Sequence, residues 1–251
     1  MTRWIRQGLR TGIRTTAYPD APETAPGVSP GLPRAGTAGV NRAAAASLAS
    51  RCPTGALIER DGQLVVDRRR CVHAFRCVRG VADPLPWEDG VEWAGAGTRF
   101  RPLEPAFGRS IHVLVVDAGD CGACLAEVRQ LNNPYYNMHR LGFFITPSPR
   151  HADLLLVVGP VTDQMRSALE RAWQAMPTPR RVLAVGACAL SGGIFGPSFV
   201  SEGGVARVLP VDVEVPGQPP PPLAILHGLL VAAGRRAPVS DPGQPVPGGG
   251  R

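Results

Sequence analysis

Three of the six cysteines in this chain directly follow apolar runs that predict buried strands. Cys121 and Cys124 form a Cys-x-x-Cys motif in a Gly-rich stretch after the run 111–116, and Cys188 comes just after the run 182–185. Thiolates are the ligands of iron–sulfur clusters and of soft metals. Open α/β folds bind their ligands outside the carboxyl ends of the strands, so we expect these thiols to meet there.

A third loop follows the strand predicted at 210–215 and carries Gln218 between Gly217 and Pro219. Together the three loops make a candidate iron–sulfur site with three cysteines and one glutamine. The alternative is that these cysteines only fill the core, because free cysteine is commonly buried. A Cys-x-x-Cys at one strand end and another Cys at a later strand end is the more specific pattern, so we favour metal ligands.

The segments that must position these loops alternate between strand and helix from residue 109 onward. Strands are predicted at 111–117, 143–145, 154–162, 182–185 and 210–215, and helices at 123–131, 163–175 and 223–233. This alternation predicts an α/β fold with a parallel, flavodoxin-like sheet.

The first half of the chain holds the other three cysteines. Cys52 begins Cys-Pro-Thr-Gly-Ala-Leu, a hairpin with an Asp-Gly turn is predicted over 58–67, and Cys71 and Cys77 follow. This order resembles a two-cluster ferredoxin module, a small α+β unit that binds each cluster through a Cys-x2-Cys-x2-Cys-x3-Cys-Pro run.

The cysteine runs of that module are incomplete here. The first run has Arg42, Ala45 and Leu48 where cysteines would stand, and the second has Ala74 and Val81. We therefore expect a degenerate ferredoxin-like scaffold that has lost its clusters. The alternative is that Cys71, Cys77 and His73 hold a smaller metal such as zinc.

Composition limits the class of protein. The chain has 251 residues and a formal charge of +7, and its 27 basic residues are all arginine, scattered without interleaved aromatics. This predicts no nucleic-acid surface. No apolar run approaches the roughly 20 residues that span a bilayer, and no signal peptide is evident, so we expect a cytoplasmic protein. Six cysteines in such a chain favour metal or redox chemistry over disulfides.

The expected domain organisation has four parts: an extended arm over 1–40, a degenerate ferredoxin-like region over 41–98, the sheet domain over 99–236, and a disordered Pro/Gly-rich tail over 237–251. The first 16 residues place Ile5, Leu9 and Ile13 four apart among arginines. That pattern predicts either a short basic amphipathic helix or a frayed terminus.

Residues 110–233 resemble the small electron-transfer subunit of membrane-bound group 4 [NiFe]-hydrogenases, such as formate hydrogenlyase, and its B-type counterpart in respiratory complex I. The matching motifs are Cys121-Gly122-Ala123-Cys124 with Glu127, Asn132-Asn133-Pro134-Tyr135-Tyr136, Ser148-Pro149-Arg150-His151-Ala152-Asp153, Gly159-Pro160-Val161-Thr162, Gly186-Ala187-Cys188-Ala189 and Pro210-Val211-Asp212-Val213. Residues 1–82 resemble, more weakly, the ferredoxin-like subunit of the same complexes, so the chain looks like a fusion of the two.

The resemblance implies one [4Fe–4S] cluster, with Cys121, Cys124 and Cys188 as ligands and Gln218 at the place of the fourth cysteine. A [4Fe–4S] cluster with another fourth ligand, a [3Fe–4S] cluster and an empty site are all open. Potentials of such clusters span roughly −700 to +450 mV and depend on net charge, so a retained cluster should have a higher potential than one with four cysteines.

The resemblance further implies a subunit that relays electrons and forms no chemical bonds itself. Its expected partners are a hydrogenase-like large subunit and membrane subunits with proton channels, which would hold it peripherally on the cytoplasmic side of the inner membrane. The alternatives are a cluster-free structural subunit that bridges the same neighbours, and a zinc-binding regulator that uses Cys71 and Cys77.

Overall fold

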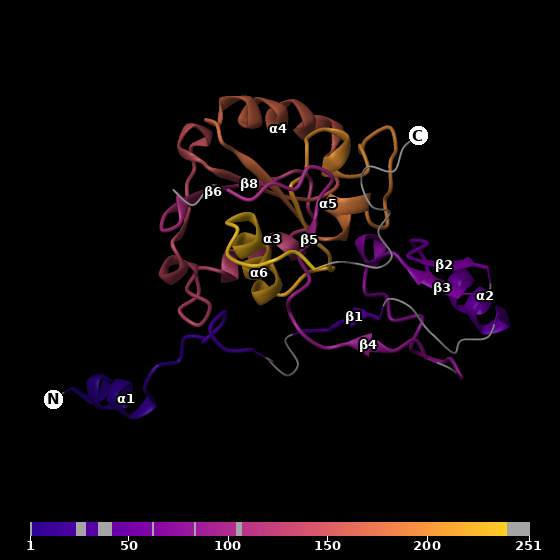
Figure 1. Cartoon of the computed structure of the whole chain (residues 1–251), viewed down its shortest axis with the longest axis horizontal. Coiled ribbons are helices and arrows are strands. Elements are labelled where there is room, and N and C mark those ends of the chain that lie inside the picture. Colours follow the sequence, from indigo (N-terminus) through magenta and orange to yellow (C-terminus); the bar gives the residue numbers. More distant parts are fainter. Residues whose placement is uncertain are drawn as a thin grey trace.

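A computed structural model of the chain describes residues 2–23, 29–34, 42–61, 63–82, 84–103 and 107–239. Its centre is a six-stranded sheet (Figure 1). In spatial order the strands are β5 (Gly95–Ala96), β10 (Val213–Val215), β9 (Arg181–Val185), β8 (Leu154–Val158), β6 (Ile111–Asp117) and β7 (Phe143–Ile145). All pairs are parallel except β5 with β10. Numbered from β6, the parallel strands lie in the order 2-1-3-4-5, one of the two common orders of doubly wound sheets. The prediction of an α/β fold with a mostly parallel sheet is confirmed.

Helices cover both faces of this sheet. On one face lie α3 (Ala123–Gln130) and α6 (Pro222–Ala232), and on the other α4 (Asp163–Ala175) and α5 (Ala187–Ser191) (Figure 1). The unbroken apolar sequence of β8 is explained by the two cores that it joins. Leu154, Leu156 and Val158 belong to the core under α6. Leu155 and Val157 belong to the core under α4 and α5. Because both faces of the strand are covered, both sets of side chains are apolar.

Every residue of α6 is buried. One side of the helix packs on β9 and β10, and residues from the first half of the chain complete its surroundings: Tyr18, Leu32 and Trp93 belong to the same core. The backbone N–H of Ala94 also donates to His227 Nδ1 at 3.1 Å. The first half of the chain is therefore part of the structure that encloses α6.

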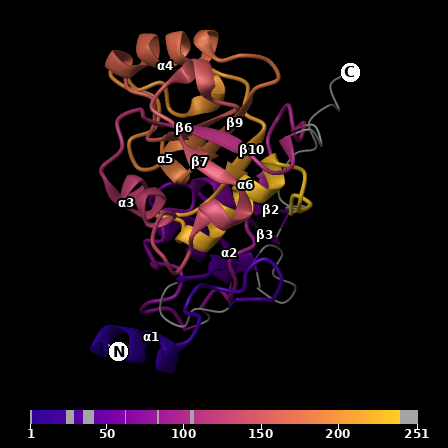
Figure 2. The same ribbon diagram turned by 90° about the vertical axis from the view of Figure 1, so that its left-hand side faces the viewer.

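The first half consists of short elements (Figure 2), some of which surround a small core of its own. They are α1 (Arg3–Thr11), β1 (Leu32–Pro33), α2 (Arg42–Arg51), β2 (Leu57–Arg60), β3 (Gln63–Val66), the 3-10 turn η1 (Arg68–Arg70) and β4 (Trp87–Glu88). Helix α2 packs on the β2–β3 hairpin, and this hairpin lies close to the predicted one over 58–67. Turn η1 contacts α5, and Arg69 Nε lies 2.8 Å from Glu214 Oε2 on β10, so the two halves are joined by an ion pair.

The arm begins as the helix α1, which stands away from the rest of the chain (Figure 1) and buries none of its residues. Trp4, Leu9 and the following Ile13 are highly exposed. Strands β4 and β5 lie before residue 99, where the sheet domain is predicted to begin, so the central sheet includes residues from the preceding region through β5. Two-residue strands carry too few side chains to produce a recognisable alternation.

Parts of all four expected domains lie outside the described residues: 1, 24–28 and 35–40 of the arm, 41, 62 and 83 of the ferredoxin-like region, 104–106 of the sheet domain, and 240–251 of the tail predicted to be disordered. Val239, in the described part of that tail, donates its N–H to Ala94 O at 2.8 Å. Within the described ranges, no helix has both the length and the apolar composition needed to cross a membrane.

Candidate functional site

Two aspartates shape the loop that carries Cys121 and Cys124. At the end of β6, Asp117 Oδ1 accepts hydrogen bonds from the backbone N–H groups of Gly119 at 2.9 Å and Asp120 at 2.7 Å. Asp120 Oδ2 in turn accepts from Gly122 N–H at 3.0 Å and Leu125 N–H at 3.1 Å. These bonds hold the turn and satisfy N–H groups at the start of α3, which have no partner within the helix.

Two glycines let the sulfur atoms approach the backbone. A Cβ atom added to Gly186, at the end of β9, would lie 2.5 Å from Cys124 Sγ, and one added to Gly193 would lie 2.7 Å from Cys188 Sγ. Both glycines have positive φ angles, 91° and 58°. Any other residue at these positions would strain the backbone and overlap a sulfur atom. Gly186 therefore brings the first cysteine loop against the second.

Gln218 lies directly against Cys188. Its Nε2 donates to Cys188 Sγ at 3.6 Å, and its Oε1 lies 3.8 Å from the same sulfur. Backbone bonds hold the two loops together, since Gly186 N–H donates to Val215 O and Ala187 N–H to Gly217 O, each at 2.8 Å. The position at which the fourth cysteine was expected is thus adjacent to the third cysteine, with an amide in place of a thiol.

Burial dominates the chemistry of the two inner thiols. Cys124 is completely buried and Cys188 nearly so, whereas Cys121 is exposed. Burial raises the pKa of Cys124, and the negative charges of Asp120, Cys188, Cys121 and Glu127 raise it further. Burial also raises the pKa of Cys188; the Gln218 hydrogen bond lowers it, and Cys121 and Asp120 raise it. Both thiols therefore keep their protons at neutral pH without a metal, and metal binding must release them.

Three thiols are the candidate metal ligands of this site. Cys121, Cys124 and Cys188 supply sulfur from two strand-end loops, and glycines hold open the space beside two of these sulfurs. In the described ranges, no three His, Cys, Asp or Glu side chains converge as they would around one ion. The ligands of a cluster bind different iron atoms, so they need not converge on one point. Buried Asp120 Oδ1, beside the cysteines, has no hydrogen-bond partner among the residues that the structure describes.

A cavity of about 480 Å³ adjoins this site. Glu127 and Gln218 line it from the second half of the chain, and His73 and Phe75 line it from the first half. Glu127 is half-buried, and burial raises its pKa. The contribution of His73 and Phe75 could not be found from the sequence, because no pattern links 73–75 to the strand ends.

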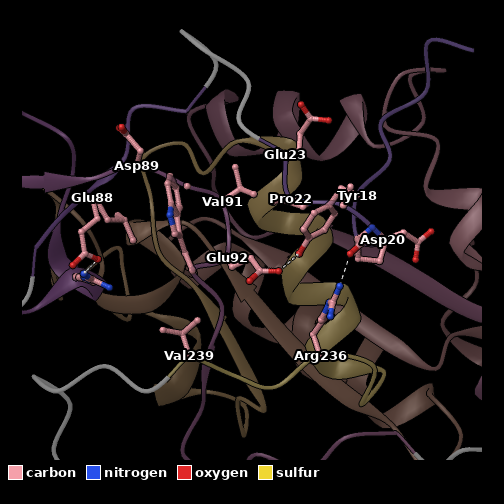
Figure 3. A pocket seen from close by; sticks show the side chains of 16 residues that line it. Tyr18, Asp20, Pro22, Glu23, Glu88, Asp89, Val91, Glu92, Arg236 and Val239 are labelled. Carbon is pink, nitrogen blue, oxygen red and sulfur yellow. Dashed lines mark hydrogen bonds and ion pairs between the residues drawn. The ribbon is translucent and has the colours of Figure 1, made fainter.

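Another cavity, of about 600 Å³, lies where the arm meets the segment 88–93 and the residues after α6 (Figure 3). Tyr18 Oη donates to Glu92 Oε1 at 3.2 Å, and Arg236 donates to the backbone oxygen of Pro19. Burial, and then the Glu92 carboxylate, raise the pKa of Tyr18, so the phenol stays protonated. Among the described residues that line this cavity there is no cysteine or histidine, and its contacts fasten the arm to the rest of the chain.

Known proteins are similar to the second half of the chain. The model of the family "NADH ubiquinone oxidoreductase, 20 Kd subunit" matches residues 121–232. Formate hydrogenlyase subunit 7 of Escherichia coli is 45% identical over 126 residues, which are 50% of this chain and 49% of that protein. The probable membrane-bound hydrogenase subunit mbhJ of Pyrococcus furiosus is 42% identical over 134 residues, 53% of this chain and 80% of that protein. The chain thus spans about half the length of the first relative and most of the second.

Among solved structures, one of the membrane-bound sulfane sulfur reductase, an archaeal respiratory membrane complex, aligns with a TM-score of 0.46 and 29% identity. The alignment covers 53% of this chain and 78% of the other. With so low a TM-score, this alignment adds nothing to the argument from sequence.

Proposed function

The chain belongs, through its second half, to the family of the 20 kDa subunit of NADH ubiquinone oxidoreductase, and from this premise we propose that it is an iron–sulfur electron-transfer subunit of a membrane-associated oxidoreductase complex. Cys121, Cys124 and Cys188 would hold the cluster, with Gln218 at the fourth position. A bound cluster would supply a carrier for one electron at a time. The chain itself would position the cluster and tune its potential.

The contact between Gln218 and Cys188 carries this proposal. Nε2 of Gln218 points an N–H at the sulfur across 3.6 Å, and donors of this kind stabilise cluster sulfurs and raise cluster potentials. Gln218 brings no negative charge, which also favours a higher potential. A [3Fe–4S] cluster, or a [4Fe–4S] cluster with a fourth ligand other than cysteine, suits such a donor set.

The partners of this chain are proposed from the names of its relatives. The two relatives are named as subunits of formate hydrogenlyase and of a membrane-bound hydrogenase. By analogy, the proposed neighbours of this chain are a hydrogenase-like large subunit and membrane proton-channel subunits. A surface for the large subunit is available beside the site. Ile194, Phe195, Phe199 and Val200 are exposed, and this segment begins directly after Gly193, which faces Cys188. Association of this kind would hold the chain at the cytoplasmic side of the inner membrane.

Purification of the full chain without oxygen tests the cluster. We expect brown protein with about three or four irons per chain and matching sulfide, lost in the variant Cys188→Ser. In Gln218→Cys a fourth thiolate would bind the cluster and add one negative charge to it. The added charge should lower the potential, measured by redox titration with EPR. An unchanged potential in a four-iron variant would contradict the role given to Gln218.

A cluster-free structural subunit is the second candidate. Gln218 supplies no thiolate at the fourth position, and the cysteine runs of the first half are incomplete. Such a subunit would only bridge a large subunit to a membrane arm. Colourless protein after anaerobic purification and reconstitution, with unchanged assembly, would favour this candidate over the relay.

A further inference from the structure

Helix α1 leaves its apolar side chains uncovered. None of its residues is buried, and the helix stands away from the other described elements in both views (Figures 1 and 2). Trp4 is 73% exposed and Leu9 is 74% exposed. A Cβ atom added to Gly8 would meet no atom of the described residues within 4 Å, apart from the helix itself. Whatever covers these side chains therefore comes from outside the part of the chain that the structure describes.

A helix of this length gains little stability from its own backbone. In water, isolated helices shorter than about 12–15 residues are marginal, and helices in proteins are stabilised mainly by the packing of an apolar face. Helix α1 has nine residues, and Thr2 makes no capping hydrogen bond through its side chain. Gly8, in its interior, lowers the helix propensity further. The stability of α1 therefore calls for a surface that covers its apolar face.

Apolar and basic side chains lie on different faces of α1. Residues three or four apart share a face of a helix, because each residue turns the chain by about 100°. One face carries the apolar side chains Trp4, Ile5 and Leu9. The opposite face carries the basic side chains Arg3, Arg6 and Arg10. Helices with this division lie in the plane of a membrane interface, with the apolar face toward the acyl chains.

The charge on and around α1 is of one sign. Residues 2–19 include four arginines and no acidic residue, and the first carboxylate is that of Asp20. Among the described residues, no ion pair includes Arg3, Arg6 or Arg10. Each arginine beside an anionic lipid surface strengthens binding about fivefold. The charge of α1 is thus complementary to anionic headgroups.

The positions of the glycines favour a bilayer over a groove in a protein. A helix that binds in a groove uses large side chains at positions i, i+3, i+4 and i+7. Counted from Ile5, these positions hold Gly8, Leu9 and Gly12, so two of the four have no side chain. A bilayer requires only apolar area and opposite charge, without fixed positions. Trp4 also suits a bilayer, because tryptophan is enriched at the level of the headgroups.

The arm is fastened to the rest of the chain directly after α1. Thr15 Oγ1 donates to Pro134 O at 3.0 Å, and Thr16 N–H donates to Tyr135 O at 2.8 Å. Only residues 12–14 lie between the helix and this attachment. In both views α4 lies at the end of the molecule opposite to α1 (Figures 1 and 2). A surface that binds α1 would therefore face the attachment and leave α4 pointing away from it.

We propose that α1 binds the surface of an anionic phospholipid bilayer, with Trp4 and Leu9 among the headgroups and the arginines on lipid phosphates. The long stems of arginine let the guanidinium reach phosphates while the helix axis lies at the interface. This proposal extends the membrane association proposed above, since the chain itself would contact lipid. It does not require a cluster at the sheet edge.

Flotation of the full chain with vesicles tests the contact. We expect binding to vesicles of phosphatidylglycerol and phosphatidylcholine, no binding to phosphatidylcholine alone, and weakening by salt. Arg6→Gln/Arg10→Gln should bind roughly 20-fold more weakly. Arg171→Gln/Arg207→Gln is the matched control, because it removes the same charge from two exposed arginines outside the arm and should bind as the parent does.

A second pair of variants tests the apolar face. Binding should shift the emission of Trp4 to shorter wavelength, and Trp4→Phe should lose this shift while it keeps the binding. Leu9→Asp should lose the binding. Because α1 buries no residue, these variants should fold as the parent does.

Two results would overturn the proposal: a parent chain that does not bind the anionic vesicles, which would leave α1 to a protein partner, or binding that Arg6→Gln/Arg10→Gln retains in full. Iron and sulfide are measured on the same samples. Colourless protein that still binds the vesicles would contradict only the electron-transfer role, and brown protein that ignores them would contradict only the role of α1.

Discussion

The two groups of cysteines are held by different means. Cys124 and Cys188 lie at the carboxyl ends of parallel strands, and their sulfurs fit against Gly186 and Gly193. The group of Cys52, Cys71 and Cys77 lies in turns outside the main sheet, beside a core of fewer side chains. In a doubly wound sheet the helices packed on both faces fix the positions of the loops. The site at the sheet edge therefore needs only the local fit of its sulfurs against glycines. The first-half cysteines depend on the small core that lies beside them.

The ferredoxin resemblance of the first half implies a second contrast. A cluster in a small module contributes to the stability of the module, so its loss leaves a cavity that must be filled. Ala45 and Leu48, at two positions where that resemblance implies cysteines, are buried in the core of the first half. The loops at the sheet edge are flanked by two larger apolar cores, and Gln218 lies in one of these loops against Cys188.

The largest expected effect comes from opening the core of the first half. Leu48 is fully buried, so Leu48→Ala should lower the free energy of unfolding by about 2–5 kcal/mol. Val81→Ala, at a half-buried position beside the same core, should cost clearly less. Urea denaturation of both variants gives the comparison. Equal costs would mean that position 48 is not part of a supporting core.

Substitution of single glycines at the sheet edge by alanine tests whether the sulfur atoms need the space beside them. Gly186 and Gly122 have φ angles of 91° and 93°, but only at Gly186 would a Cβ meet a sulfur. Both changes to alanine should cost about 1–2 kcal/mol of backbone strain, and Gly186→Ala about 1–3 kcal/mol more from overlap. Chemical denaturation measures the costs, and bound iron should fall only in Gly186→Ala. The same loss in both variants would remove the special role of Gly186.

Stability should fall in acid because of a buried histidine. Burial lowers the pKa of His227 from 6.5 to about 4; Glu92 raises it and Arg236 lowers it. Between pH 6.5 and 4 the unfolded chain binds the proton and the folded chain does not, so stability decreases as pH falls through this range, by up to roughly 3 kcal/mol. His227→Gln should flatten this part of the curve in thermal or urea unfolding. His73, whose pKa burial lowers to about 4, should contribute in the same direction, so His73→Gln is the matched variant for the first half.

The smallest effect concerns Asp120. Its carboxylate raises the pKa of Cys124 and Cys188, while its Oδ2 holds the start of α3. Asp120→Asn keeps an oxygen for these bonds, so it should cost about 1 kcal/mol or less. Without the charge, the pKa of Cys188 should fall, so Cys188 should be alkylated faster at pH 8, measured by mass spectrometry. Cys52, in the first half of the chain, is the internal control, and equal acceleration there would indicate general loosening.

The sheet could be predicted from the sequence because its strands are continuous apolar runs. Strand β8 is such a run because both of its faces are covered. The loop of Cys188 could be placed beside the loop of Cys121 and Cys124, since parallel strands end at the same edge of the sheet. The functions of Asp120 and Asp212 could not be predicted. Asp212 Oδ2 accepts from Val182 N–H at 2.8 Å and so fastens β10 to β9, a long-range bond without a sequence signature. The gathering of Cys52 with Cys71 and Cys77 is likewise tertiary.

The fully buried helix α6 determines when the first half of the chain can complete its packing during synthesis. The residues that cover it, Tyr18, Leu32 and Trp93, are translated well before the helix itself. Until then the covering residues have no helix to pack against, and the nascent chain exposes apolar surface. A chaperone that holds the early segments until the helix emerges would therefore protect this apolar surface.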